Sequence, residues 1–291
     1  MFPSPLDVPE GQRARGAYRL RFEDLMQDGR LQVEAIVCSI GAAVWRPLLS
    51  NHPAMHTFER EGIRAIFTRL VVERGPARVP LFGQVSAEGR YELAFEPGPD
   101  GAATRLYVNM WTEITESGGR GVAARLFAEH VLTRVLAKPG ERRVTEVPGV
   151  PRPETVYRPA PPESLLTLEE GAEWTEPGSR ADAGPTAFGL LHTDPNQHVN
   201  SLVYTRLFEE AALRRLRALG QGTRLAVKRT EIAFRKPFFA GDAAIVVCRA
   251  FREGGSPGAS GGFVDAGAGE GSAAGGSTPR PHAYVRMTFE E

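Results

Sequence analysis

The sequence predicts an α+β protein made of two similar halves. Each half opens with a short strand-like run, continues with a long helical pattern, and ends in strand-like runs that follow one another directly. This order favours a helix packed on an antiparallel sheet over alternating strand–helix units around a parallel sheet. The two copies lie about 170 residues apart. A chain of 291 residues is long enough to bury two separate cores.

The first half is predicted to be a domain spanning residues 1–137. Alternating apolar and polar side chains predict a strand over 18–22. Apolar residues at helical spacing predict a helix over 31–49, and its scarcity of charge predicts burial on most sides. A second helical pattern covers 120–137. Runs rich in β-branched and aromatic residues predict strands within 62–74, 84–95 and 104–115.

A proline-rich segment separates the halves. Seven prolines fall between Pro139 and Pro162, and the residues that follow are irregular, so 138–185 is predicted to be an extended linker.

The second half is predicted to be a domain spanning residues 186–291. It shows a short apolar strand over 187–192 and a helix over 199–219. Gly220 and Gly222 are expected to end this helix. Residues 254–277 contain ten Gly, five Ala and four Ser, a composition typical of a disordered loop between strands. Further strands are expected at 224–235, 243–251 and 282–289.

Composition and charge exclude several classes of function. Lys plus Arg is 35 and Asp plus Glu is 35, so the basic excess that nucleic-acid binding needs is missing. No apolar run approaches a membrane span, and the first sixteen residues lack the apolar core of a secretory signal. Cys38 and Cys248 are expected to be buried, reduced thiols. The sequence therefore predicts a cytoplasmic protein with no nucleic-acid or membrane partner.

Three polar residues alternate on the loop that leads into the second long helix: Asp194, Asn196 and His198. The first N–H groups of a helix lack intrahelical partners and carry the positive end of the helix dipole. We therefore expect the backbone near Val199 to hold a carbonyl oxygen that gains negative charge during acyl transfer. Taken singly, Asp and Asn at such a loop are ordinary turn and capping residues, and only their combination with a histidine favours a site.

The run DPNQHVNSLVY, from Asp194 to Tyr204, resembles the signature of the hotdog-fold acyl-ACP thioesterases of plants and bacteria. The resemblance implies a tandem (double) hotdog, in which each domain wraps a curved antiparallel sheet around a long helix and the second carries the catalytic residues. It also implies that Glu231, on the strand after the helix, completes the site as a water-activating base or a nucleophile. From its own surroundings, Glu231 is equally suited to a salt bridge with an arginine. Asn200 and Tyr204 are expected to support the site.

The sequence departs from that family at two positions. Ile232 stands where a cysteine often follows the glutamate, so a cysteine nucleophile has no support, and Ser201 replaces a second asparagine. The first copy lacks the motif: placing Asp24 opposite Asp194 puts Asp28 opposite His198. We therefore expect a degenerate first site, and the resemblance implies that this half lines the pocket for the acyl chain.

The sequence thus predicts a thioester hydrolase of fatty acid biosynthesis or related lipid metabolism. Its substrate would be a fatty acyl, or related acyl, chain on acyl carrier protein or coenzyme A. No cofactor is expected, and no metal, since the histidines lack metal-ligand spacing. A hotdog dehydratase or isomerase and a non-catalytic acyl-binding protein remain alternatives, because one fold hosts several chemistries. The carrier, the chain length and the choice between monomer and homodimer stay open.

Overall fold

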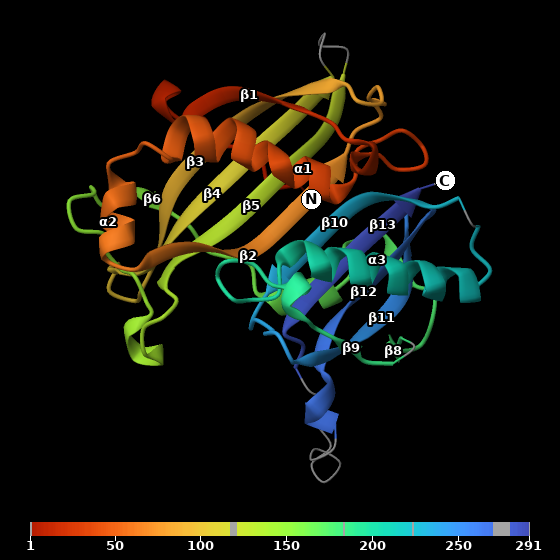
Figure 1. Cartoon of the computed structure of the whole chain (residues 1–291). Coiled ribbons are helices and arrows are strands. Elements are labelled where there is room, and N and C mark those ends of the chain that lie inside the picture. Colours follow the sequence, from red (N-terminus) through yellow and green to blue (C-terminus); the bar gives the residue numbers. More distant parts are fainter. Residues whose placement is uncertain (1, 117–120, 183, 223, 270–279, 291) are drawn as a thin grey trace. The chain divides into compact units, whose positions relative to one another are not determined.

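The computed structural model describes residues 2–290 apart from 117–120, 183, 223 and 270–279, and divides the chain into two compact units (Figure 1). Unit 1 is Met1–Ala160 and unit 2 is Pro161–Glu291. Each unit is an antiparallel sheet with helix on one face, which confirms the α+β class.

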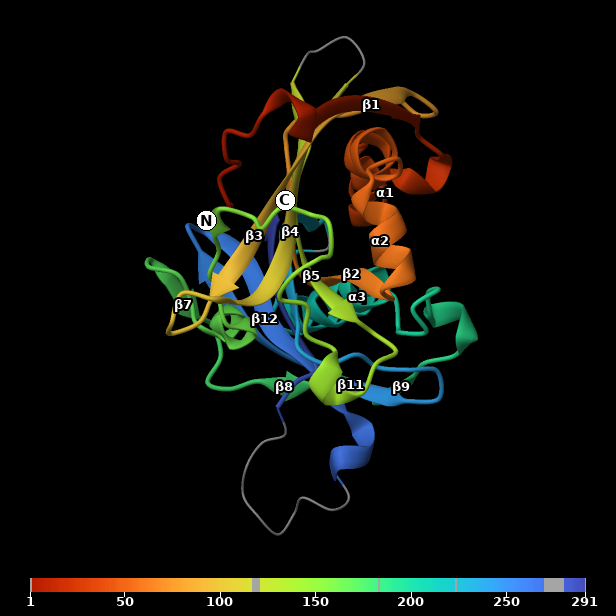
Figure 2. The same cartoon turned by 90° about the vertical axis from the view of Figure 1, so that its left-hand side faces the viewer.

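The helices and strands of unit 1 are, in chain order, β1 (Arg13–Arg19), α1 (Val33–Ile40), a π-helical continuation (Gly41–Leu49), α2 (Ala54–Arg60), β2 (Ile63–Arg74), β3 (Gln84–Pro97), β4 (Ala103–Glu116), β5 (Val122–Arg134) and β6 (Thr155–Val156). The main strands pair antiparallel in the order β1-β3-β4-β5-β2, and β6 adds in parallel to β3. The helices lie on one side of this sheet, as the edge-on view in Figure 2 shows.

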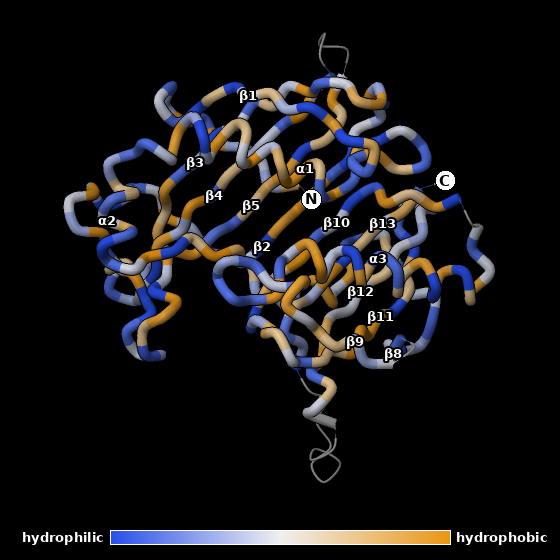
Figure 3. Tube along the Cα trace, in the orientation of Figure 1, coloured by the Kyte–Doolittle hydropathy of each residue, from blue (hydrophilic) through white to orange (hydrophobic). Residues whose placement is uncertain are grey.

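Apolar side chains of α1 and β2 form much of the core of unit 1, and both elements carry hydrophobic stretches in Figure 3. Two polar contacts fix the helix on the sheet. The Tyr18 hydroxyl donates to the Ala35 carbonyl at 2.8 Å, and the hydroxyls of Ser39 and Thr112 lie 2.5 Å apart. The predicted helix over 31–49 and the three predicted strands that follow it are confirmed.

The helix predicted over 120–137 is wrong, because its described part forms strand β5. β5 pairs with β4 on one side and with β2 on the other. A central strand covered on both faces buries apolar residues in an almost continuous run instead of at every second position. Its spacing therefore imitates a helix.

The helices and strands of unit 2 are, in chain order, β7 (Ala172–Trp174), β8 (Arg180–Ala181), β9 (Thr186–Ala187), α3 (Ser201–Ala218), β10 (Ala226–Phe234), β11 (Ala243–Glu253), β12 (Ser256–Asp265) and β13 (Ala283–Glu290). Short 3-10 helices occur at Pro162–Leu166, Leu190–His192 and Ala266–Gly269. The sheet order is β10-β13-β12-β11-β7, and β8 and β9 also pair with β11.

Different segments cover the two faces of the unit 2 sheet. On one face, Tyr204 of α3 packs its ring against Phe234 and Phe263, with centroids 5.4 and 5.1 Å apart. On the other, the 3-10 helix Pro162–Leu166 lies against the strands, and its Leu165 carbonyl accepts a hydrogen bond from the Ser260 hydroxyl at 2.6 Å. The helix predicted over 199–219 is confirmed within two residues at each end.

The segment predicted as an extended linker, 138–185, divides between the two units instead of standing apart from them. In unit 1 its β6 strand extends the sheet, and the Tyr157 hydroxyl donates to the Glu129 carboxylate at 2.5 Å. In unit 2 its 3-10 helix covers the sheet. Prolines favour extended backbone, and extended backbone can still pair and pack at a sheet surface.

The glycine-rich run predicted as a disordered loop over 254–277 contains the strand β12 and a short 3-10 helix, while 270–277 lie outside the described residues. β12 is buried between β11 and β13. A Cβ at Gly261 would lie 1.9 Å from the Val247 carbonyl oxygen, so only glycine fits there. In this strand a low-complexity composition reflects close packing.

Within the described part of the chain, no single helix is long and apolar enough to cross a membrane. Val33–Leu49 and Ala54–Arg60 satisfy the length and composition criteria only together, and they are bent by 100°.

Candidate active site

The motif loop of unit 2, residues 192–200, is a tight turn held by its own backbone. The Asp194 N–H donates to the His198 carbonyl at 3.0 Å, and the Gln197 N–H donates to the Asp194 carbonyl at 2.8 Å. Asp194 Oδ1 accepts the Asn196 N–H at 2.8 Å. Asp194, Asn196 and His198 are all partly exposed. The turn therefore fixes the backbone of the three polar residues while leaving their side chains within reach of a ligand.

Unit 1 repeats this turn with different side chains. The Met26 N–H donates to the Arg30 carbonyl at 2.8 Å, and the Gly29 N–H donates to the Met26 carbonyl at 3.0 Å. These bonds place Met26, Asp28 and Arg30 at the positions of Asp194, Asn196 and His198. The sequence alignment that set Asp28 opposite His198 is therefore off by two residues.

Charge pairing occupies the turn of unit 1. The Arg30 guanidinium donates to the Asp28 carboxylate at 2.6 Å, and both side chains are largely buried. Hydrogen bonds from Arg30 and the charges of Arg30 and Arg74 hold the pKa of Asp28 below its usual value, although burial acts to raise it. An acid neutralised in this way is a poor catalyst, so the repeat keeps the backbone and not the chemistry.

At the start of α3, the backbone N–H of Val199 already has a hydrogen-bond partner within the protein. It donates to the Phe238 carbonyl at 2.8 Å, so the prediction that this N–H holds an oxyanion is wrong. Asn200 is the N-cap of α3, and its Oδ1 accepts the Leu202 N–H at 2.9 Å. Asn200 thus fixes where the helix begins.

Beneath the motif loop lies a buried aromatic cluster, consisting of Phe188, Tyr204, Phe238 and His282. The Phe238 N–H donates to the Tyr204 hydroxyl at 3.1 Å, which links α3 to the turn after β10. Burial, together with the charges of Asp242 and Asp194, raises the pKa of Tyr204 to about 12. Tyr204 therefore stays neutral at physiological pH, and its role in supporting the site stays a prediction.

The turn after β10 also meets the motif directly. The Phe239 ring lies edge-on to the His198 ring, with centroids 5.3 Å apart. Asp242 holds this turn, because its Oδ2 accepts the Phe239 N–H at 2.8 Å and its carbonyl accepts the Phe188 N–H at 2.8 Å. In the described structure, the segment that contacts His198 therefore presents an aromatic ring.

Glu231 pairs with an arginine on the β10 face that points away from α3, and its place in the catalytic site stays a prediction. Side chains alternate along β10, so Glu231 faces away from Phe234 and from the α3 side of the sheet. The Glu231 carboxylate lies 3.1 Å from the Arg229 guanidinium, and Glu231 as a whole is 4% exposed. Arg286 is the residue opposite Glu231 on the neighbouring strand, β13. Of the two roles open at the sequence level, the structure supports the salt bridge.

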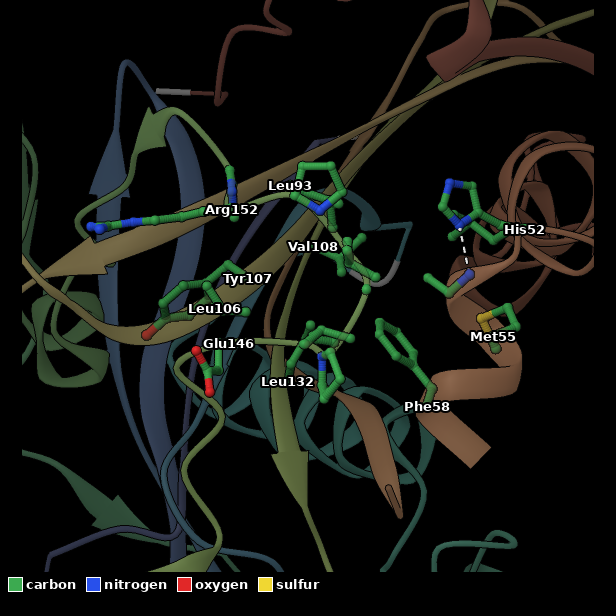
Figure 4. Close-up of a pocket in the computed structure, with 18 of the residues that line it drawn as sticks. His52, Met55, Phe58, Leu93, Leu106, Tyr107, Val108, Leu132, Glu146 and Arg152 are labelled. Atoms are coloured by element: carbon green, nitrogen blue, oxygen red, sulfur yellow. Dashed lines mark hydrogen bonds between the residues drawn. The ribbon is translucent and has the colours of Figure 1, made fainter. Parts of the chain in front are cut away.

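Unit 1 contains an apolar cavity of about 570 Å³ between its helices and its sheet (Figure 4). Met55 and Phe58 of α2 face Leu106, Val108 and Leu132 of the strands across it. Charged and polar side chains, among them Glu146, Arg152 and His52, also line it. Its volume and apolar lining are typical of pockets for small organic ligands.

Other reactive groups offer no second site. Among the described residues, no group of three or more His, Cys, Asp and Glu side chains is arranged to hold a metal ion. Cys248 is buried, which raises its pKa to about 11, whereas Cys38 is exposed, against the prediction that both thiols are buried. Cys38 lies on the outward side of a helix whose neighbouring residues fill the core.

No protein-family model matches the sequence, and neither does any curated protein sequence. Solved structures do match. A protein described as an oleoyl thioesterase, from Lactobacillus plantarum, has a TM-score of 0.64 at 13% identity, with 96% of each chain covered. A 12:0-ACP thioesterase from Umbellularia californica has a TM-score of 0.60 at 11% identity, covering 96% of this chain and 94% of the other. The chain has the fold of the acyl-ACP thioesterases.

A third structure carries the same fold. An acyl-ACP thioesterase from Bacteroides thetaiotaomicron has a TM-score of 0.57 at 12% identity, covering 97% of this chain and 99% of that one. The acyl-ACP thioesterase fold therefore extends over nearly the whole chain, and not over the motif region alone. Identities this low establish the fold, and the activity has to be argued from the site.

Sequence reasoning missed the residues that support the site from below. Phe188, Phe238 and His282 come from three separate segments, and nothing in their local patterns shows that they meet. Asp242 follows a glycine, a pair typical of an ordinary turn, so its sequence context does not mark it as a support for the site. A signal was present in the aromatic pair after β10, because two adjacent phenylalanines in a turn need a partner to cover them.

Proposed function

We propose that the chain is a thioester hydrolase that acts on acyl chains carried by acyl carrier protein or coenzyme A, and that its two units are tandem hotdog domains. The observation that carries the proposal is the contrast between the two turns. Unit 2 presents Asp194, Asn196 and His198 on a fixed, partly exposed backbone at the start of α3. Unit 1 has the same backbone with an ion pair in their place.

Each polar residue has a role that suits its geometry. The Asn196 side-chain amide donates a hydrogen bond to the thioester carbonyl oxygen, whose negative charge grows as water attacks. His198 takes a proton from that water as its oxygen bonds to the carbonyl carbon. The C–S bond then breaks, and His198 returns the proton to the departing thiolate sulfur. Asp194 accepts the Asn196 N–H and so sets the orientation of Asn196.

The cavity of unit 1 supplies a place for the acyl chain. Burying a methylene group contributes about 0.8 kcal/mol, so an apolar cavity of about 570 Å³ favours a chain of several carbons. We propose that the unit 1 cavity holds the acyl chain. Val108→Phe, which fills the cavity, should then shift preference toward shorter chains without lowering kcat for the shortest substrate.

The proposal is tested by thiol release from saturated acyl-ACP and acyl-CoA substrates of increasing chain length. Wild type should release thiol, and Asn196→Ala and His198→Ala should each lower kcat by about 10²-fold or more. Asp28→Ala and Arg30→Ala are the matched controls at the same backbone positions of unit 1 and should retain activity.

A different result would redirect the assignment. Absence of thiol release from every saturated substrate would refute the hydrolase proposal. Turnover of 3-hydroxyacyl or unsaturated thioesters would then indicate a dehydratase or isomerase, and binding alone would indicate an acyl-binding protein.

A further inference from the structure

His282 holds the turn after β10 through several contacts. Its carbonyl accepts the N–H groups of Arg235 and Lys236 at 2.8 and 3.0 Å. Its ring stacks on Phe238, with centroids 4.1 Å apart and planes 20° apart. The Pro237 carbonyl acts to raise the pKa of this ring. Arg235, Lys236 and Phe238 of the turn therefore all contact one histidine.

One ring nitrogen of His282 is buried without a hydrogen-bond partner among the described residues. This nitrogen is Nδ1. A neutral ring with its proton on Nε2 satisfies this arrangement. A second proton, on Nδ1, would place a buried N–H where no acceptor is present.

The turn after β10, which His282 contacts, also holds the motif loop in place. The carbonyl of Phe238 accepts the Val199 N–H, and its N–H donates to the Tyr204 hydroxyl. The next residue, Phe239, places its ring against His198. A shift of the turn would therefore move the ring beside His198 and the start of α3 together.

We infer that neutral His282 is a positioning residue for the motif, which keeps His198 in a productive orientation through Phe238 and Phe239. The inference rests on the proposed function, since it assigns His198 to the chemistry. Charged groups around the ring favour the neutral form: Lys236 and Arg235 of the turn disfavour a second proton, and Asp265 of β12 opposes them. Burial and these two cations lower the pKa of His282 below its ordinary value.

Two variants separate the ring, its polar nitrogens and its titration. His282→Phe keeps a stacked ring and removes both nitrogens, so we expect kcat to fall about tenfold with KM changed less than twofold. His282→Gln keeps a donor and cannot gain a proton in this pH range. We expect it to restore kcat to within about threefold of wild type and to remove the His282 contribution from the acid limb of the kcat profile.

The matched control is His130→Phe in unit 1. His130 is also buried, and its ring packs on Phe67 at 4.2 Å, but it belongs to unit 1 and the motif belongs to unit 2. Its variant should lose stability without changing kcat or the acid limb. Equal kcat in His282→Phe and wild type, or equal losses in His282→Phe and His130→Phe, would overturn the inference.

A second readout does not depend on turnover. The Phe239 ring beside His198 shifts the ring-proton resonances of His198, so NMR of histidine-labelled protein reports their geometry directly. We expect these resonances to move in His282→Phe and not in His130→Phe. Unchanged His198 resonances would overturn the positioning role even in a protein that hydrolyses nothing, whereas moved resonances without hydrolysis would overturn the proposed function alone.

Discussion

Glu231 and Tyr204 lie on opposite faces of the same sheet. Tyr204 packs on Phe234 from the α3 side, under the motif loop. Glu231 points to the other face, where it pairs with Arg229 at 3.1 Å. On that face Arg286, its cross-strand neighbour, donates to the Leu165 carbonyl at 3.0 Å. One face of the sheet therefore packs under the motif loop, and the other binds the 3-10 helix Pro162–Leu166 at the start of unit 2.

Replacing Glu231 by Gln should destabilise the protein and spare its chemistry. The change leaves buried arginine charge without its carboxylate, a loss that typically costs about 3–5 kcal/mol. Urea unfolding measures it, with Glu163→Gln as control. Glu163 pairs with Arg280 at an exposed site, so its loss should cost less than about 1 kcal/mol. Unchanged stability in Glu231→Gln, combined with lost activity, would return Glu231 to a catalytic role.

Gln197→Gly should stabilise unit 2. Gln197 has a φ of 63°, a left-handed backbone that costs a side-chain-bearing residue about 1–2 kcal/mol, and unit 1 places Gly29, with a φ of 79°, at the same point of its turn. Glycine loses more entropy on folding, so the expected net gain is about 0.5–1 kcal/mol. Thermal unfolding measures it. Gly29→Gln should show the opposite sign, and a stabilising Gly29→Gln would contradict the equivalence of the two turns.

Asn200→Ala should remove the N-cap of α3 and lower the free energy of unfolding by about 1 kcal/mol. Asn200→Asp, which keeps an acceptor for the Leu202 N–H, should recover most of that loss. Denaturant titration of the three proteins decides the matter. A loss in the aspartate variant as large as in the alanine variant would mean that the side-chain amide of Asn200 has another role.

Stability should fall in acid because of His130. Burial lowers the pKa of His130 to about 4, so the unfolded chain binds its proton more readily than the folded protein does. The contribution is present above the ordinary pKa of about 6.5 and is lost as pH falls toward 4, on the order of 3 kcal/mol in total. His130→Phe should flatten this part of the stability profile. An unchanged pH slope would show that folding does not change the pKa of His130.

The order of elements could be predicted from the sequence because it depends on local patterns. The helix over 31–49 follows from its apolar periodicity, and the three strands after it follow from their β-branched and aromatic residues. The strand predicted over 18–22 instead lies earlier, at Arg13–Arg19. Residues 120–137 and the glycine-rich run were misassigned because their spacing and composition reflect the neighbours they pack against, which lie far away in the sequence. In β5, neighbours on both sides remove the alternation of buried and exposed side chains that marks a strand. In β12, a Cβ at Gly261 would lie 1.9 Å from the carbonyl oxygen of a neighbouring strand, so no side chain fits at that position.

The candidate site could be predicted only as far as it is continuous in sequence. Asp194, Asn196 and His198 are close in the chain and share one turn. Glu231 was joined to them by resemblance, although the alternation along its strand already placed it on the face opposite Phe234. The engagement of the Val199 N–H by Phe238 depends on a segment almost forty residues away, which no local pattern reveals.

The most direct test of the account compares His198→Ala with Glu231→Gln. The initial rate of thiol release from saturated acyl-ACP should be measured per folded molecule, beside wild type. The account predicts release by wild type, a loss of about 10²-fold or more in His198→Ala, and a rate within a few-fold of wild type in Glu231→Gln. Retained release in His198→Ala together with its loss in folded Glu231→Gln would contradict the assignment of the chemistry to the motif loop.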